Sequence, residues 1–162
     1  MRKRLLKVGV IALAMLMPTS AAWADKYVIC PVPRSITMNS GTLAMTPKVN
    51  VVCENTIDGI TKNRLTNLLA EHGIETLFDG GDAANVTVRL GTVGSGGEVE
   101  TLAFGDLGLT KSKVMVSKKF DRHAIKVSAE GITIIGENTN AVFYGLASLE
   151  QMMEQQVDGA LE

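Results

Sequence analysis

The hydrophobic residues of this chain alternate between two kinds of spacing, and this alternation constrains the fold more than any other feature. Lys48–Cys53 and Asn85–Leu90 are short apolar or alternating segments, which predict strands. Between them the period changes to that of a helix. Asp58 is a candidate N-cap for a helix beginning near Ile60, and Gly73 is a candidate stop. The apolar face of this helix is predicted to hold Leu65, Leu68, Leu69 and His72.

The last third of the chain repeats the same change of period. Ala124–Ser128 and Gly131–Ile135 are separated by two residues, which predicts a tight antiparallel hairpin. Thr139 or Asn140 then caps a second helix, in which Gly145 indicates a close approach to the sheet. The predicted buried stripe of this helix is Val142, Leu146, Leu149 and Met153, with Phe143 and Met152 widening the apolar arc.

Several weaker segments complete the pattern. Residues 35–38 and 42–45 flank Asn39-Ser40-Gly41, which predicts another hairpin. Short strands are also expected at 27–30, 75–78 and 113–117, and loops at 79–82 and 94–97. Because the strands come mainly in hairpins, we expect an α+β fold with a mostly antiparallel sheet and two main helices gathered on one face.

The first residues have the features of an export signal. Basic residues at positions 2, 3, 4 and 7 precede the apolar run Val8–Met17, and Ala22-Trp23-Ala24 supplies a small-x-small cleavage site. We therefore expect a signal peptide at 1–24, an exported domain at 25–158, periplasmic or extracellular, and the start of a linker at 159–162. The apolar run is shorter than the roughly 20 residues of a membrane-spanning helix.

The charge and the cysteines of the remaining chain set further limits. Residues 25–162 hold 12 basic and 17 acidic side chains, a formal net charge of −5. This acidic balance argues against nucleic acid or an anionic membrane as a partner. Cys30 and Cys53 are the only cysteines. Export permits a disulfide between them, whereas two separately buried thiols are the alternative, and an even count alone decides neither.

No pattern of a catalytic or metal site stands out in the sequence. Asp79 and Asp82 lack the spacing of a calcium loop. His72 and His123, with the two cysteines, lack the spacing of a zinc site. The chain has no G-x-S-x-G nucleophile motif. We therefore predict no catalytic residue, no metal ligand and no cofactor.

Several motifs, taken in order, resemble one known domain. Gly131–Met152, with its Gly-Glu-Asn-Thr-Asn turn before the helix, resembles the closing strand and helix of the accessory domain in O-GlcNAcase-like, hyaluronidase-type β-N-acetylglucosaminidases and in β-hexosaminidases. Pro31–Ile36 is similar to the opening of that domain, and Val49–Val52 followed by Ile57–Leu65 resembles its O-GlcNAcase-like form. The chain departs from the family at Asp121-Arg122-His123, where His123 takes the place of a usual tyrosine.

The resemblance implies that the chemistry lies in a β/α barrel that follows this domain in the family. There an acidic pair assists attack by the 2-acetamido group of the substrate. No position of this chain matches that catalytic motif, so none is carried over. The first hypothesis is therefore a non-catalytic accessory domain, a fragment without its barrel. The alternatives are a freestanding module that binds glycans, such as N-acetylglucosamine-containing ones, or another protein, and a small enzyme without a recognisable motif.

Overall fold

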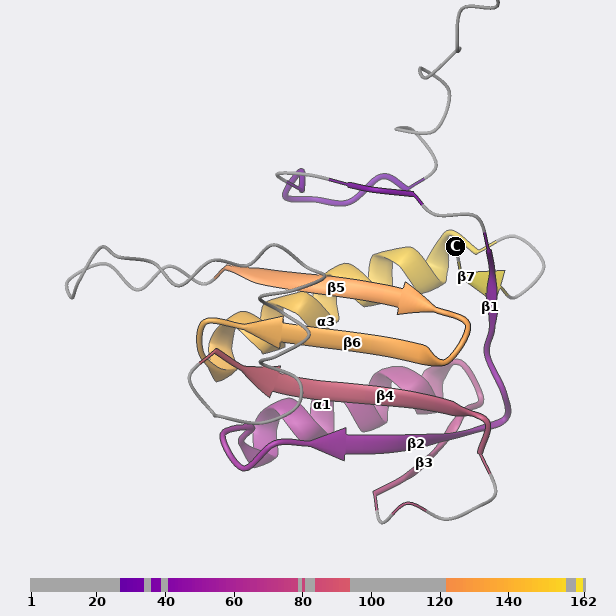
Figure 1. Ribbon diagram of the computed structural model, residues 1–162, viewed down its shortest axis with the longest axis horizontal. Coiled ribbons are helices and arrows are strands. Elements are labelled where there is room, and N and C mark those ends of the chain that lie inside the picture. The colour runs from indigo at the N-terminus through magenta and orange to yellow at the C-terminus, as the bar shows by residue number, and fades with distance from the viewer. Residues whose placement is uncertain are drawn as a thin grey trace, which may run out of the picture.

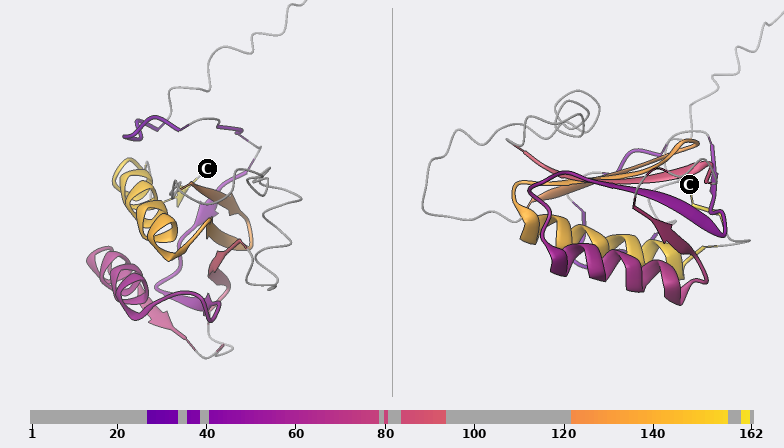
Figure 2. Two further views of the ribbon diagram at one scale, coloured as in Figure 1. Left: turned by 90° about the vertical axis from the view of Figure 1, so that its left-hand side faces the viewer. Right: turned by 90° about the horizontal axis from the view of Figure 1, so that it is seen from below.

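The computed structural model describes residues 27–33, 36–38, 41–78, 80, 84–93, 122–156 and 160–161. Two helices pack on one face of a five-stranded sheet whose strand order is β3-β2-β4-β6-β5, and a second sheet pairs β1 with β7 (Figures 1 and 2). The expected signal peptide, the strand at 113–117 and the loop at 94–97 lie outside the described residues. So do Asp79 and Asp82. The described elements are β1 Leu43–Ala44, β2 Lys48–Cys53, α1 Gly59–Glu71, β3 Glu75–Leu77, β4 Val86–Thr92, β5 His123–Ser128, β6 Gly131–Gly136, α3 Thr139–Glu154 and β7 Ala160–Leu161.

The pairing of the main sheet confirms the α+β class but corrects the expected strand directions. β5 and β6 form the predicted antiparallel hairpin, with Ser128 opposite Gly131. The other three pairings, β2 with β3, β2 with β4, and β4 with β6, are parallel. The physical reason is clear for β2 and β3: α1 lies between them and returns the chain to the end where β2 began. The expectation of a mostly antiparallel sheet is therefore wrong among the described strands.

Local side chains explain where α1 begins and ends. Asp58 has an extended backbone and accepts a hydrogen bond from the Thr61 N–H at 2.7 Å, as the sequence predicted for an N-cap. The backbone and side-chain hydrogen bonds from Thr61 hold the pKa of the Asp58 carboxyl below its ordinary value. Gly73 follows the helix with a φ of +72°, which glycine adopts readily. His72 is the C-cap and is exposed, so its predicted place on the buried face is wrong.

The cap of α3 is Asn138, one residue before the first of the two candidates in the sequence. Asn138 accepts a hydrogen bond from the Ala141 N–H at 2.9 Å. Thr139 is the first helical residue, and its hydroxyl lies 3.2 Å from the hydroxyl of Thr61 in α1. The N-terminal ends of both helices therefore meet at the same edge of the sheet.

The core lies between the helices and the sheet. The predicted stripe of α3 is confirmed, since Val142, Leu146, Leu149 and Met153 are all buried. The prediction for Gly145 is also confirmed, because a Cβ at this position would lie 2.7 Å from Cγ2 of Ile134. Contacts from the sheet come from Val49, Val51, Val86, Val88, Leu90, Ile132 and Ile134, and those from α1 come from Leu65, Leu68 and Leu69.

The small sheet joins β1, early in the chain, to β7 near the C-terminal end of the described residues. Leu43 in β1 lies opposite Leu161 in β7, in antiparallel register, and both side chains are buried. The expected hairpin between 35–38 and 42–45 is therefore wrong, since β1 pairs with β7 and residues 36–38 form no strand. Ala160 and Leu161, which the sequence placed in a linker, belong to the folded unit. Their partner is distant in the chain, and local spacing carries no information about such a pairing.

Both cysteines are free thiols in the described structure. Cys30 is exposed and Cys53 is half-buried, so they do not form the disulfide that the sequence left open. The alternative of two buried thiols is also wrong for Cys30. Burial raises the pKa of the Cys53 thiol, and Lys62 opposes that effect. In the part of the chain that is described, no helix is both long and apolar enough to cross a membrane.

Candidate functional site

The described residues that were weighed as metal ligands, His72, His123, Cys30 and Cys53, do not form a metal site. Within the described ranges, no group of three or more His, Cys, Asp or Glu side chains is arranged to hold a metal ion. His72 lies exposed at the end of α1, whereas His123 lies on β5 with its Nε2 3.3 Å from Oγ of Ser148 in α3. The two histidines therefore lie on different elements, one at the end of α1 and the other on β5.

The structure also shows how the domain accommodates His123 in place of the usual tyrosine. A Cβ at Gly145 would lie 3.3 Å from Cδ2 of the His123 ring, so this ring packs over the glycine of α3. Arg122, the residue before it, donates from Nε to Glu137 at 2.8 Å. Arg122 is thus bonded to the residue that follows β6, and His123 packs against α3. The hairpin and α3 both form with histidine at this position.

Among the described residues, a shallow groove lies between α1 and α3. It has a volume of about 430 Å³ and is lined by residues of both helices, which lie side by side on one face of the sheet (Figure 2). Its apolar wall comes from Ile60, Leu68 and Phe143, and its charged wall includes Arg64, Glu71 and Glu150.

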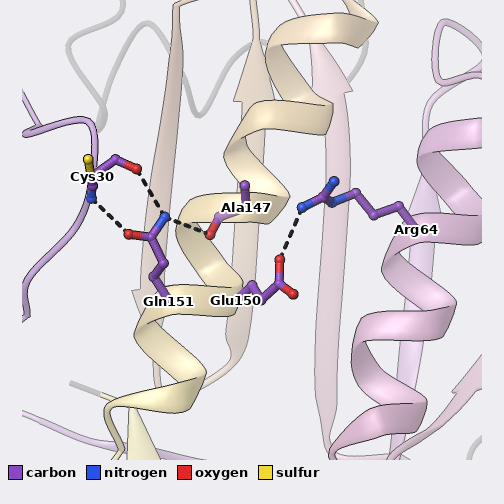
Figure 3. A network of polar contacts seen from close by, with 5 residues as sticks. All are labelled: Cys30, Arg64, Ala147, Glu150 and Gln151. Atoms are coloured by element: carbon purple, nitrogen blue, oxygen red, sulfur yellow. Dashed lines mark hydrogen bonds and ion pairs between the residues drawn. The ribbon is translucent and has the colours of Figure 1, made fainter.

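Arg64 links the two helices across this groove. Its Nη2 lies 3.0 Å from Oε2 of Glu150 in α3 (Figure 3), and its guanidinium carbon lies 4.3 Å from the centre of the Phe143 ring. A guanidinium over an aromatic ring gains a cation–π attraction of about 0.5–1 kcal/mol at an exposed site. The half-exposed ion pair adds little stability by itself. The arrangement therefore joins the two helices across an amphipathic groove and does not stabilise the core.

Exposed apolar side chains extend this surface at the N-terminal ends of the helices. Ile60 is 72% exposed and Tyr144 is 53% exposed. The Tyr144 ring stands edge-on to Phe143, with 6.2 Å between the ring centres. Apolar side chains clustered beside a groove mark an interaction surface. We call Ile60, Arg64, Phe143, Tyr144 and Glu150 the outer helical surface.

The sequence predicted this surface only in part. Phe143 was expected at the edge of the apolar arc of α3 and lies half-buried in the groove. Met152 was expected beside it at the edge of the arc, but it is only 8% exposed and belongs to the core. Arg64 and Glu150 were missed, because charged residues on a helix look like an ordinary solvated face until the neighbouring helix is placed.

Comparison with known proteins gives three related findings. The family described as glycosyl hydrolase family 20, domain 2, matches residues 26–162. The solved structure of CpGH84D is 29% identical, with a TM-score of 0.70 over 85% of this chain and 23% of that one. No curated protein matches the chain.

Two further solved structures share the fold at lower identity. CpGH84B is 20% identical, with a TM-score of 0.59 over 83% of this chain and 21% of that one. The beta-N-acetylhexosaminidase from Bacteroides fragilis NCTC 9343 is 17% identical, with a TM-score of 0.51 over 82% of this chain and 22% of that one. This chain thus spans less than a quarter of the length of each of these three structures. The family match runs from residue 26 to residue 162, and on that ground the chain belongs to glycosyl hydrolase family 20, domain 2.

Proposed function

We propose that this chain is the non-catalytic N-terminal accessory domain of a secreted glycoside hydrolase of the β-N-acetylglucosaminidase type. The observation that carries the proposal is the extent of the match. The family match covers residues 26–162, yet the chain spans only 23% of CpGH84D and 22% of the Bacteroides fragilis beta-N-acetylhexosaminidase. Because the matching region is so small a part of the length of these chains, we expect the catalytic part to lie in the rest of the polypeptide.

The outer helical surface supports a contact with that catalytic part. It combines an aromatic pair, an arginine and exposed apolar side chains, which are the residue types that dominate protein–protein interfaces. The sheet already covers the opposite side of both helices (Figure 2). A catalytic barrel packed on α1 and α3 would cover Ile60 and Tyr144.

The test begins with an activity assay of the purified chain. We expect no turnover of an aryl N-acetylglucosaminide, and turnover that is lost on mutating one of the chain's own carboxylates would overturn the proposal. DNA sequencing downstream of residue 162 should show a barrel reading frame, intact or shifted. An unrelated gene there would instead favour a freestanding module.

If the barrel is present, the thermal unfolding of the barrel shows whether the accessory domain is docked on it. Ile60→Lys with Tyr144→Lys, made in the longer protein, should lower the thermal midpoint of the barrel while leaving that of the accessory domain unchanged. The matched control is Glu130→Lys, at the exposed turn of the β5–β6 hairpin. Equal midpoints in all three proteins would place the interface elsewhere.

Export is the second part of the proposal, and it rests on the n-region, apolar run and Ala-x-Ala site of residues 1–24. We expect mass spectrometry of the exported protein to show Asp25 as the first residue. Exported protein that retains Met1 would contradict cleavage at this site.

A further inference from the structure

An N-terminal segment is held against α3 by two glutamine side chains. The Val28 N–H donates to Oε1 of Gln155 at 2.7 Å, and Nε2 of Gln155 donates to the Val28 carbonyl at 2.9 Å. The Cys30 N–H donates to Oε1 of Gln151 at 2.8 Å, and Nε2 of Gln151 donates to the Cys30 carbonyl at 3.1 Å (Figure 3). We call Gln151 and Gln155 the glutamine clamp.

The spacing of the partners explains why the clamp works. Residues 28 and 30 are two apart, so in an extended segment their N–H and C=O groups point to the same side. Gln151 and Gln155 are four apart and therefore lie on one face of the helix. Each side-chain amide offers one acceptor and a donor, as a residue of a neighbouring strand would. The helix thus substitutes for a strand that would pair with this segment.

The clamp binds the main chain and leaves the two paired side chains outside. Val28 is 76% exposed and Cys30 is also exposed. The residues between and before them face inward, since Tyr27 is buried and Ile29 packs against the core. The segment is therefore anchored by two hydrogen-bonded pairs and by two side chains on its inner side.

A second connection joins the same two regions of the chain. β1 pairs with β7, and the buried Leu43 and Leu161 face each other across that pair. Both connections link residues before position 45 to residues after position 150, at sequence separations of 127 and 121 for the clamp. Figure 1 shows β1 running beside β7 at the C-terminal end of the described chain.

We infer that residues 27–30 and β1 act together as a clasp that fixes the C-terminal end of the domain, so that opening the glutamine clamp loosens β7. The clamp holds the last turns of α3, and β1 holds the strand that follows α3. Neither connection alone is extensive, because β1 and β7 are two residues long and the clamp is exposed. The functional consequence of this inference rests on the accessory role proposed above. In that role, the clasp sets the position from which the chain continues into the barrel.

Amide hydrogen exchange of the whole chain tests the coupling. Gln151→Leu with Gln155→Leu removes both amides and keeps side chains of similar size. We expect exchange to become about tenfold faster or more in the peptide that contains Val28 and Cys30, and faster also in the peptide that contains β7. Exchange in α1 and β4 should not change. Glu154→Leu, which adds the same side chain to an exposed position of α3, is the matched control.

Faster exchange in the peptide that contains Val28 and Cys30, with unchanged exchange in the β7 peptide, would overturn the coupling. Unchanged exchange in both peptides would overturn the clamp. A second variant guards against general destabilisation. Gln151→Glu with Gln155→Glu keeps an acceptor but has no donor at pH 7. The protonated acid at about pH 3, below the ordinary glutamate pKa of about 4.3, regains a donor.

At pH 7, the amide NMR signals of Val28 and Cys30 in the glutamate variant should therefore differ from those of the parent. At about pH 3, the signals of the variant should approach those of the parent. Signals that stay displaced at low pH would also overturn the clamp. Neither measurement involves a barrel or a substrate. A failed accessory role would therefore leave both results unchanged, and a failed clasp would leave the accessory role unaffected.

Discussion

Gly131→Ala is expected to lower the free energy of unfolding by about 2–6 kcal/mol, a large share of the roughly 5–15 kcal/mol that stabilises a typical domain. Gly131 begins β6 with a φ of +142°, which side-chain-bearing residues rarely adopt. A Cβ at this position would lie 1.9 Å from the carbonyl oxygen of Thr87 in β4. Because Thr87 is opposite Gly131 in the parallel ladder, the overlap is relieved only by separating two inner strands of the sheet.

The matched control is Gly73→Ala after α1. Gly73 also has a positive φ, but a Cβ there would meet nothing within 4 Å. This substitution should cost only the backbone strain of about 1–2 kcal/mol. Urea unfolding of both variants measures the difference. Equal losses would show that backbone strain alone, rather than the close approach of β4, requires glycine at position 131.

Local patterns in the sequence predicted the elements that local physics determines. The β5–β6 hairpin was predicted correctly, because two strand-like segments separated by Ala129-Glu130 have few other ways to pair. The stripe of α3 was also predicted correctly. Its residues recur at helical spacing, and they can be buried together only if that face of the helix meets the sheet.

Pairings between distant segments could not be predicted in the same way. The parallel ladder of β2 and β4 depends on the path of the chain through α1 and β3. β1 and β7 are each two residues long, so neither has enough length to show a period. The expected hairpin at 35–45 failed for this reason, since the true partner of Leu43 is Leu161.

The candidate surfaces show the same limit for polar residues. Gln151 and Gln155 are spaced for one helix face, but polar residues on a helix usually face water, and nothing in the sequence shows that residues 28 and 30 lie beside them. The edge of the apolar arc was also uncertain. Phe143 and Met152 were both expected beside the predicted stripe, and only the packed structure shows that Met152 is buried whereas Phe143 is half-buried.

Leu146→Ala is expected to cost about 2–5 kcal/mol of unfolding free energy, because the substitution leaves a cavity in the core. Leu146 is completely buried and lies in the middle of the α3 stripe, next to the glycine that brings the helix close to β6. Neighbouring side chains have little freedom to fill the space, since a Cβ at Gly145 would already lie 2.7 Å from Ile134. Urea unfolding of the variant and the parent measures the loss.

Tyr144→Lys is the control from the same helix, two residues before Leu146. Its side chain is 53% exposed, so this change should alter stability by no more than about 0.5 kcal/mol. It removes an aromatic ring from the outer helical surface, and light scattering should therefore show less association of the isolated domain. If Leu146→Ala unfolds at the urea concentration of the parent while Tyr144→Lys unfolds earlier, α3 presents the opposite face to the sheet. The outer helical surface would then be part of the core.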